Sequence, residues 1–234
     1  MTRKINILIV EDEEAIRTGL IDVFVYHGYA VEYAGDGNTG LKMALSGKHD
    51  LILLDIMLPG LNGFEVCQQI RERDRDLPII MLTAKTGDED IIQGLSLGAD
   101  DYVGKPFSVA QLVLRVQAVL RRSRVGLELE QHIVLGDLEI DCVNLSGCRG
   151  DDAVPFTRKE MDILQYLNSN RDRPVPREEL LSRLWGYGRD LNIETRTVDI
   201  HIAKLRRKIE ADPTQPAYLL TVRGAGYKLQ SGAT

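Results

Sequence analysis

The sequence contains little of what marks a secreted or membrane-spanning protein. Its three cysteines, Cys67, Cys142 and Cys148, fit no metal-ligand spacing. Cys142 and Cys148 could lie on one hairpin and cross-link, which a reducing cytosol disfavours. No apolar run approaches the roughly 18 residues of a membrane span, and the run at 5–10 meets acidic residues too soon for a signal peptide. These absences predict a cytoplasmic protein.

Charge is unevenly distributed along the chain. The formal net charge of −6 divides into −4 over residues 1–124, −6 over 125–155 and +4 over 156–234. An acidic first part and a basic last part indicate different partners for the two ends.

Strand and helix signals alternate through the first half and then change. Five strands are predicted at 5–10, 30–33, 50–55, 78–82 and around Tyr102, each followed by a helix, near 14–27, 37–47, 63–73, 88–97 and 108–122. This alternation predicts an α/β fold with a doubly wound five-stranded parallel sheet. Short strands over 133–156, helices near 158–169, 176–185 and 194–210, and a terminal hairpin predict a smaller α+β domain. We expect domains at 1–122 and 132–234 and a linker at 123–131.

Polar residues follow four of the predicted parallel strands. Glu11 and Asp12 follow the first, Asp55 ends the third, and Thr83 and Lys105 follow the fourth and fifth. Because ligands bind outside the carboxyl ends of such strands, these side chains should converge. Clustered carboxylates call for a cation, and hard oxygen ligands suit Mg²⁺. Asp55 could then attack phosphorus while Lys105 neutralises the phosphoryl oxygens. The alternative is that Asp55 caps a loop and that Glu11 and Asp12 are solvated charges.

Four stretches resemble the receiver domain of two-component response regulators. They are VEDEE (10–14), LLDIMLPGLNGFEV (53–66), MLTAK (81–85) and GADDYVGKPF (98–107). The resemblance implies a flavodoxin-like (CheY-like) fold and phosphorylation of Asp55 by a sensor histidine kinase. It also implies a Mg²⁺ ion bound by Asp12, Asp55 and the backbone carbonyl of Met57, with Glu11 acting through water. Lys105 would pair with the phosphoryl group, and the bond from Lys105 to Pro106 would be cis.

Thr83 and Tyr102 match the switch pair of this family. Phosphorylation adds negative charge and three acceptor oxygens. The Thr83 hydroxyl could donate to one of them and draw its loop inward, leaving space for the Tyr102 ring to turn in. Alternatively, Thr83 is an ordinary residue at the end of a strand and Tyr102 an ordinary core residue.

The predicted helix at 194–210 has two distinct faces. Steps of 100° per residue gather Val198, Ile202, Leu205 and Ile209 into a core stripe. The opposite face carries Arg196, Ile200, Ala203, Lys204 and Arg207, flanked by Thr197 and His201. Basic residues around an exposed Ile200 suit a helix in the major groove of DNA, although a plain solvated face is the alternative.

The second half resembles the winged-helix output domain of the OmpR/PhoB family. The matching stretches are FTRKEMDILQYL (156–167), VPREELLSRLWG (175–186), ETRTVDIHIAKLRRKIE (194–210) and TVRGAGYKL (221–229). The predicted DNA-binding residues are Arg196, Thr197, Ile200, His201, Lys204, Arg206, Arg207, Arg223 and Tyr227. Arg223 could enter a minor groove, and Tyr227 either contacts phosphate or packs. The resemblance also implies a loop near 186–193 of the kind that can contact RNA polymerase.

Members of this family form homodimers through one face of the receiver. Asp100, Asp101, Arg115 and Arg122 match the charged residues of that face, with Asp101 meeting Arg115 across it. Ile91 and Gln111 depart from the usual charged pair. The alternative is that these charges face water, where exposed pairs contribute only about 0–1 kcal/mol.

These features predict a phosphorylation-dependent transcriptional regulator that binds promoter DNA as a dimer. The alternative is a DNA-binding protein with a passive receiver. We do not expect an enzyme beyond slow self-dephosphorylation. A phosphatase acting through an aspartyl phosphate would need an acid where Met57 stands, and no catalytic constellation follows residue 125.

Overall fold

The computed structural model describes residues 3–84, 88–121, 130–186 and 196–230. The chain divides into two compact units, Met1–Leu120 and Arg121–Thr234. They are called the N-terminal and C-terminal units below. The predicted linker, 123–131, lies mostly outside the described residues. In the described part of the chain, no helix is long and apolar enough to cross a membrane.

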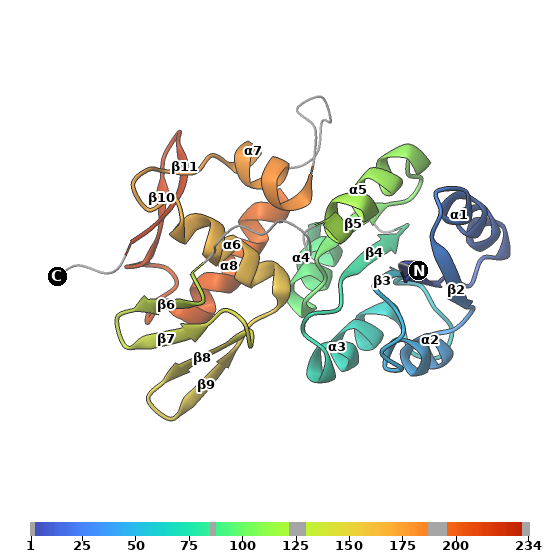
Figure 1. The fold of residues 1–234 in the computed structure, drawn as a ribbon, viewed down its shortest axis with the longest axis horizontal. Helices are drawn as coiled ribbons and strands as arrows, with labels where there is room; N and C mark the ends of the chain where they lie inside the picture. Colours follow the sequence, from blue (N-terminus) through green and yellow to red (C-terminus); the bar gives the residue numbers. More distant parts are fainter. Residues whose placement is uncertain (1–2, 85–87, 122–129, 187–195, 231–234) are drawn as a thin grey trace. The chain divides into compact units, whose positions relative to one another are not determined.

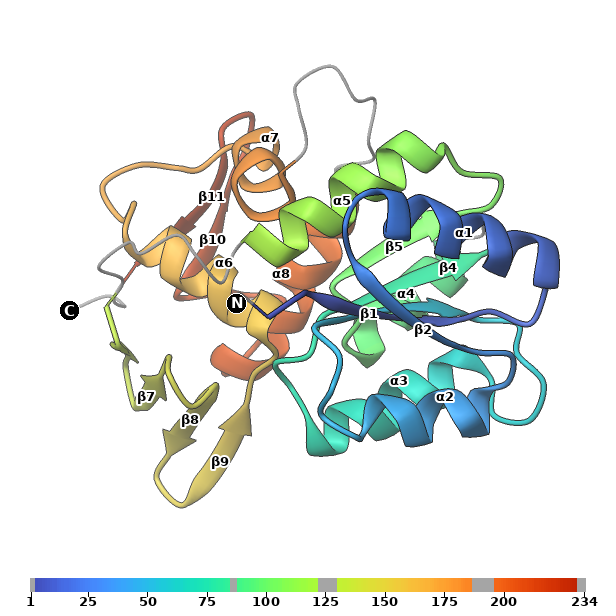
Figure 2. The same cartoon turned by 45° about the vertical axis from the view of Figure 1, so that its right-hand side comes forward.

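The N-terminal unit is built on a five-stranded parallel sheet in the order β2-β1-β3-β4-β5 (Figure 1). The strands are β1 (Asn6–Val10), β2 (Ala30–Ala34), β3 (Leu51–Asp55), β4 (Ile79–Thr83) and β5 (Asp101–Gly104). The helices are α1 (Glu14–Tyr26), α2 (Gly37–Ala44), α3 (Gly63–Arg73), α4 (Asp88–Leu97) and α5 (Val109–Arg121). Helices α1 and α5 lie on one face of the sheet and α2 and α3 on the other (Figure 2). The predicted doubly wound, flavodoxin-like sheet is therefore confirmed.

Burial on both faces explains why the central strands are apolar without alternation. Every residue of β3 and β4 is buried. On one face, Leu51 and Leu53 pack with Phe24 of α1 and Val116 of α5. A parallel strand covered on both sides requires an apolar side chain at each position. The polar exceptions are Asp55 at the end of β3 and Thr83 at the end of β4, which makes both candidates for function.

Helix α3 begins immediately behind Asp55 because of two local features. Asn62 caps the helix by accepting from the backbone N–H of Glu65 at 3.0 Å, and Glu65 accepts in return from the Asn62 N–H at 2.9 Å. A Cβ atom on Gly63 would lie 2.1 Å from the Asp55 carbonyl oxygen. Only glycine therefore allows the helix to start this close to the strand.

The C-terminal unit combines an antiparallel sheet, three helical segments and a hairpin. The sheet has the order β6-β7-β8-β9, with β6 (His132–Leu135), β7 (Leu138–Asp141), β8 (Ser146–Arg149) and β9 (Asp152–Pro155). The remaining elements are α6 (Arg158–Asn168), α7 (Arg177–Leu180), the π-helix η2 (Leu181–Trp185), α8 (Arg196–Ile209), β10 (Leu219–Val222) and β11 (Gly226–Leu229). The single helix expected at 176–185 is thus an α-helical turn that continues as a π-helix. None of the three cysteines, all of which lie in the described residues, forms a disulfide.

The core of this unit matches the stripe predicted for α8. Val198, Ile202, Leu205 and Ile209 are at most 1% exposed and share one apolar cluster with residues of α6 and η2. Helix α8 therefore turns its apolar side inward, and its opposite side carries the residues considered for DNA binding.

Candidate functional site

Three carboxylates meet at the carboxyl ends of β1 and β3. Oxygens of Glu11, Asp12 and Asp55 all lie within 4.8 Å of one another. Glu11 is fully buried and Asp55 is 3% exposed, whereas Asp12 is exposed. Strand order explains the cluster, because β1 and β3 are neighbours in the sheet although paired residues such as Leu8 and Ile52 are 44 positions apart in the chain. The structure thus brings Glu11, Asp12 and Asp55 together at one edge of the sheet, as predicted.

Lys105 brings a positive charge to the same cluster from the end of β5. Its Nζ donates to Glu11 Oε2 at 2.7 Å, to Glu11 Oε1 at 3.0 Å and to Asp55 Oδ2 at 2.8 Å. The peptide bond between Lys105 and Pro106 is cis, as the sequence predicted. The other Asp55 oxygen, Oδ1, accepts from the Met57 N–H at 3.2 Å. Both carboxylate oxygens of Asp55 are therefore held in place.

One ammonium does not compensate two buried carboxylates. Burial raises the pKa of Glu11, Lys105 opposes this through its hydrogen bonds, and Asp55 adds repulsion, so that the pKa of Glu11 rises to about 7. Hydrogen bonds from Lys105 to Asp55 and Glu11 overcome its own desolvation and raise the pKa of Lys105. The cluster consequently carries excess negative charge near neutral pH.

A divalent cation fits this donor set. Mg²⁺ prefers carboxylate oxygens and keeps several waters, which requires a site open on one side. Glu11 and Asp55 provide buried oxygens, and Asp12 provides an exposed one. The Mg²⁺ predicted from the sequence therefore has a suitable acidic site.

Thr83 and Tyr102 lie together beside this cluster, on β4 and β5. Thr83 is fully buried and Tyr102 is 8% exposed. Burial raises the pKa of Tyr102, and a hydrogen bond with the Thr83 side chain opposes the shift. The two residues of the predicted switch are therefore already in contact, with the ring of Tyr102 inside rather than in solvent.

The exposed face of α8 retains part of the predicted DNA-binding set. Ala203 and Arg207 are exposed, and Arg223 is exposed in the turn between β10 and β11. Thr197 and Ile200 are each 9% exposed, so the expectation of an exposed Ile200 is wrong. The side chain of Arg196 lies outside the described residues, as does most of the predicted loop at 186–193.

Two residues of α8 that were predicted to contact DNA, Lys204 on the basic face and His201 beside it, instead face the neighbouring helices. His201 is fully buried, with its ring centroid 5.5 Å from that of Trp185. Lys204 is 8% exposed, and its Nζ lies 3.2 Å from Glu160 Oε1. Glu160 of α6 covers Lys204, and Trp185 of η2 covers His201. Their assignment to the DNA interface is therefore corrected.

Arg206 and Tyr227 likewise serve the fold. Arg206 Nε donates to the Leu219 carbonyl at 2.9 Å, which ties α8 to β10. Tyr227 is 3% exposed, and its hydroxyl donates to Asp199 and accepts from Arg177 at 2.9 Å. Tyr227 therefore packs inside the C-terminal unit, which was the alternative to a phosphate contact. Sequence periodicity missed these contacts because they join residues far apart in the chain.

The charges predicted at a dimer interface are paired within the chain. Arg71 Nη2 lies 2.9 Å from Asp100 Oδ2, and both side chains are under 9% exposed. Arg115 Nη1 lies 2.9 Å from Asp101 Oδ2. The expected pair of Asp101 and Arg115 thus forms inside one molecule. Arg122 lies outside the described residues.

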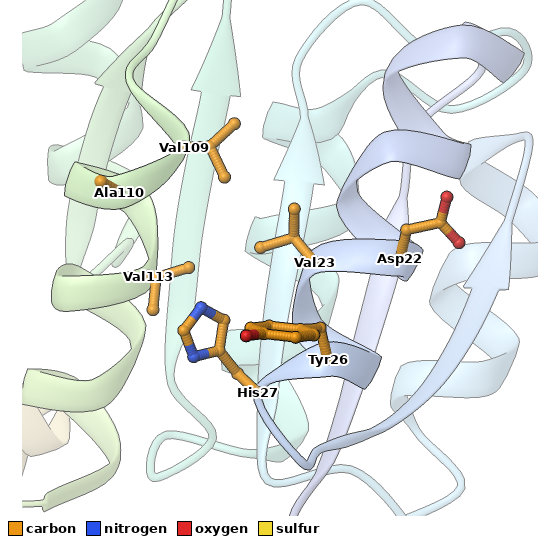
Figure 3. Close-up of a pocket in the computed structure, with 7 residues that line it drawn as sticks. All are labelled: Asp22, Val23, Tyr26, His27, Val109, Ala110 and Val113. Atoms are coloured by element: carbon orange, nitrogen blue, oxygen red, sulfur yellow. The ribbon is translucent and has the colours of Figure 1, made fainter.

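A groove between α1 and α5 lies apart from the carboxylate cluster (Figure 3). Its lining residues are Asp22, Val23, Tyr26, His27, Val109, Ala110 and Val113. Tyr26 is 87% exposed and stacks edge-on against His27. This lining is mainly apolar and provides no cluster of catalytic groups.

Comparison with known proteins places both units. The model "Response regulator receiver domain" matches residues 7–117, and "Transcriptional regulatory protein, C terminal" matches 151–229. The chain is 44% identical to the alkaline phosphatase synthesis transcriptional regulatory protein PhoP of Bacillus subtilis, covering 96% of each chain. It is 41% identical to the sensory transduction protein RegX3 of Mycolicibacterium smegmatis, covering 96% of this chain and 99% of the other. The structure of DrrB, a Thermotoga maritima OmpR/PhoB homologue, aligns over 97% and 99% of the chains with a TM-score of 0.52 and 30% identity.

Proposed function

Because this chain belongs to the OmpR/PhoB family of two-component response regulators, we propose that Asp55 is the residue at which it is phosphorylated. The family makes the chain a phosphorylation-dependent transcriptional regulator with a receiver and a DNA-binding domain. The observation that carries the proposal is the contact of Lys105 with both Glu11 and Asp55 at the carboxyl edge of the sheet. Among the described residues, Glu11 and Asp55 are the carboxylates at that edge that combine burial with an ammonium partner, and the phosphoacceptor motif of the family falls on Asp55.

The chemistry follows from the way in which Asp55 is held. A carboxylate oxygen of Asp55 attacks the phosphorus of a phosphohistidine on the sensor kinase. The O–P bond forms as the P–N bond breaks, and the imidazole nitrogen retains the electron pair. The ammonium of Lys105 is in place before the reaction begins. As the phosphoryl group arrives, Lys105 exchanges a carboxylate contact for a phosphoryl oxygen. Glu11, Asp12, Asp55 and the Met57 carbonyl would hold Mg²⁺, which neutralises charge on the phosphoryl oxygens when it is bound.

The switch then depends on Thr83 and Tyr102. A new acceptor oxygen on Asp55 competes for the Thr83 hydroxyl, which now hydrogen-bonds with Tyr102. Breaking that bond changes the packing between β4 and β5 and the adjoining helices. Two discrete arrangements, rather than graded strain, are expected because the surrounding core is tightly packed.

For DNA binding, we place the open face of α8 in the major groove. Ala203 and Arg207 are exposed on this face. Arg196 is assigned to it from its sequence position alone, and Arg223 would extend from the hairpin toward a minor groove. A homodimer formed on phosphorylation would bind two half-sites about one helical turn apart. The loop at 186–193 would contact RNA polymerase, and self-dephosphorylation would be slow.

Two measurements test this function. The full chain incubated with acetyl phosphate and Mg²⁺ should gain the mass of one phosphoryl group, whereas Asp55→Ala should gain none. Asp22→Ala, which changes an exposed aspartate of α1, is the matched control and should behave like the parent. Gel-shift titrations should then show tighter promoter binding after phosphorylation of the parent and no change for Asp55→Ala. Equal enhancement in both would mean that the effect does not act through Asp55, and no enhancement in the parent would support the passive-receiver alternative; either result would overturn the proposal.

A further inference from the structure

Arg17 reaches back from the first turn of α1 to the backbone of the acidic turn. Its Nη1 donates to the carbonyl of Glu11 at 2.8 Å and to the carbonyl of Asp12 at 3.1 Å. Glu11 and Asp12 contribute two of the three clustered carboxylates. One cation therefore holds the peptide groups of both residues without contacting their side chains.

These two carbonyls lie where the helix itself offers no donor. The first intrahelical bond of α1 runs from the Arg17 N–H to the Glu13 carbonyl at 2.9 Å, so the carbonyls of Glu11 and Asp12 precede the helical pattern. Glu13 occupies the N-cap position and makes no side-chain capping bond. The charged guanidinium thus takes over the role of fixing the turn, and hydrogen bonds from charged donors are stronger than neutral ones.

Other contacts hold the guanidinium and the opposite side of the turn. The Arg17 guanidinium lies 5.4 Å from the centroid of the Tyr33 ring, a cation–π distance. The Glu11 N–H donates to the carbonyl of Ala34, the last residue of β2, at 3.1 Å. The Glu11 peptide is therefore fixed from β2 on one side and from α1 on the other.

Asp12 depends most on this arrangement. Lys105 orients the side chains of Glu11 and Asp55 directly. The exposed side chain of Asp12 makes no hydrogen bond within the described residues, so its direction is set by its backbone. The Arg17 contact with the Asp12 carbonyl is the interaction that restrains this backbone.

We propose that Arg17 is a positioning residue for the divalent-cation site. It fixes the peptide groups of Glu11 and Asp12 so that their carboxylates point at one ion, and it does not touch the ion or the phosphoryl group. This inference rests on the proposed function of Asp55 and extends it to a residue outside the cluster. Outer residues that orient metal ligands typically change metal affinity about 10- to 100-fold when they are removed.

The test is Mg²⁺ binding to the full chain, measured by isothermal titration calorimetry. Arg17→Met keeps most of the aliphatic stem and removes the donors, and its Mg²⁺ Kd should rise about tenfold or more. Arg3→Met removes the same charge from an exposed site of the N-terminal unit and should leave the Kd within about twofold of the parent. An equal change in both variants would mean that only net charge matters and would overturn the inference.

Two further measurements separate positioning from a general structural effect. In the Asp12→Asn background, Arg17→Met should weaken Mg²⁺ binding much less, because the ligand that it positions has been removed. At saturating Mg²⁺, Arg17→Met should be phosphorylated by acetyl phosphate at close to the parental rate, with only the Mg²⁺ midpoint shifted. Additive effects of Arg17→Met and Asp12→Asn on the Mg²⁺ Kd would contradict the inference. So would a lowered maximal phosphorylation rate with an unchanged Mg²⁺ midpoint.

Failure of the inference can be told from failure of the proposed function. If the parent gains no phosphoryl mass, or if Asp55→Ala gains as much, the function assigned to Asp55 is wrong. If the parent is phosphorylated on Asp55 but Arg17→Met binds Mg²⁺ as the parent does, only the role of Arg17 is wrong. Should Arg17→Met unfold, Arg17→Gln carries the same test, since its shorter amide cannot span both carbonyls.

Discussion

Among the described residues, each unit buries one glutamate completely, and the surroundings of these two glutamates are opposite in charge. In the N-terminal unit, Glu11 and Asp55 share a single ammonium, that of Lys105. In the C-terminal unit, Glu160 lies between two ammonium groups, with Lys204 Nζ at 3.2 Å and Lys208 Nζ at 2.6 Å. One cluster has a carboxylate in excess, and the other has an ammonium in excess.

The two pKa shifts follow from this difference. Burial and the nearby Asp55 raise the pKa of Glu11 despite Lys105. Burial also disfavours the charge of Glu160, but Lys204 and Lys208 outweigh it and hold its pKa below the ordinary value. A site that binds a cation or a phosphoryl group needs a carboxylate whose charge is not fully compensated. A contact that only stabilises the fold needs carboxylates that are fully paired with cations. The comparison assigns the first description to the N-terminal cluster and the second to the joint between α6 and α8.

The largest expected effect comes from removing the charge of Glu160. Glu160→Gln should lower the free energy of unfolding of the C-terminal unit by about 3 kcal/mol, because two largely covered lysines lose their counter-charge. Glutamine can still complete the capping box with Thr157, so the variant isolates the charge. Urea unfolding followed by fluorescence of Trp185, the only tryptophan of the chain, reports on this unit.

Glu139→Gln is the matched control for this change. Glu139 lies on the exposed side of β7, and its replacement should alter the free energy of unfolding by less than about 0.5 kcal/mol. Similar losses in the two variants would mean that Glu160 is not the charged partner the comparison requires.

The next effect is the pH dependence of Mg²⁺ binding. Because the pKa of Glu11 is raised to about 7, a metal ion that binds below this pH must displace a proton. Mg²⁺ affinity should rise by up to about tenfold per pH unit between pH 5 and 7 and level off above 7. Calorimetric titrations across this range measure the slope, and Glu11→Gln should flatten it. A flat profile in the parent would show that Glu11 is already ionised throughout.

A smaller effect of opposite sign to the Glu160 result is expected for Glu11→Gln without metal. A raised carboxyl pKa stabilises the fold fully only below about pH 4.5, and this contribution is lost as the pH rises through 7. Removing the carboxyl should therefore stabilise the metal-free N-terminal unit at pH 8 by on the order of 1 kcal/mol. Hydrogen exchange of peptides from β1 and β3 can measure it, and added Mg²⁺ should reverse the ranking of variant and parent.

The smallest effect is expected at an exposed ion pair of the C-terminal unit. Arg149 Nε and Asp137 Oδ1 are 3.2 Å apart, with side chains 31% and 71% exposed. Asp137→Asn should change the free energy of unfolding by only about 0–1 kcal/mol, since water already screens the pair. The same urea titration applies. A loss as large as that of Glu160→Gln would mean that burial does not set the scale of these interactions.

The sequence predicted the N-terminal cluster well because strand ends determine its geometry. Apolar runs located β1, β3 and β4, and parallel order then brought Glu11, Asp55 and Lys105 to one edge. No side-chain detail was needed for that step. Arg17 was not anticipated, because its partners are backbone carbonyls and leave no trace in the residue types around them.

The C-terminal unit was predicted less completely, and the reason is physical. Helical periodicity identified Val198 and Ile202 as core residues, but it gives only an angle around the axis. Whether a residue outside the core stripe, such as Lys204, contacts DNA or a neighbouring helix depends on what packs beside it. The burial of Glu160 on α6 decided this, and a glutamate three residues after a capping threonine gave no sign of a second role.

Helix α8 is bonded along both flanks, to Glu160 through Lys204 and Lys208 and to Arg177 and Tyr227 through Asp199. In the proposed complex with DNA, a helix held in this way loses little further conformational freedom when it enters the groove. Its heat-capacity change on association should therefore match the apolar area covered, with no added contribution from coupled folding of α8. The conformational change on binding is instead expected in the DNA duplex, so that its sequence-dependent stiffness contributes to specificity.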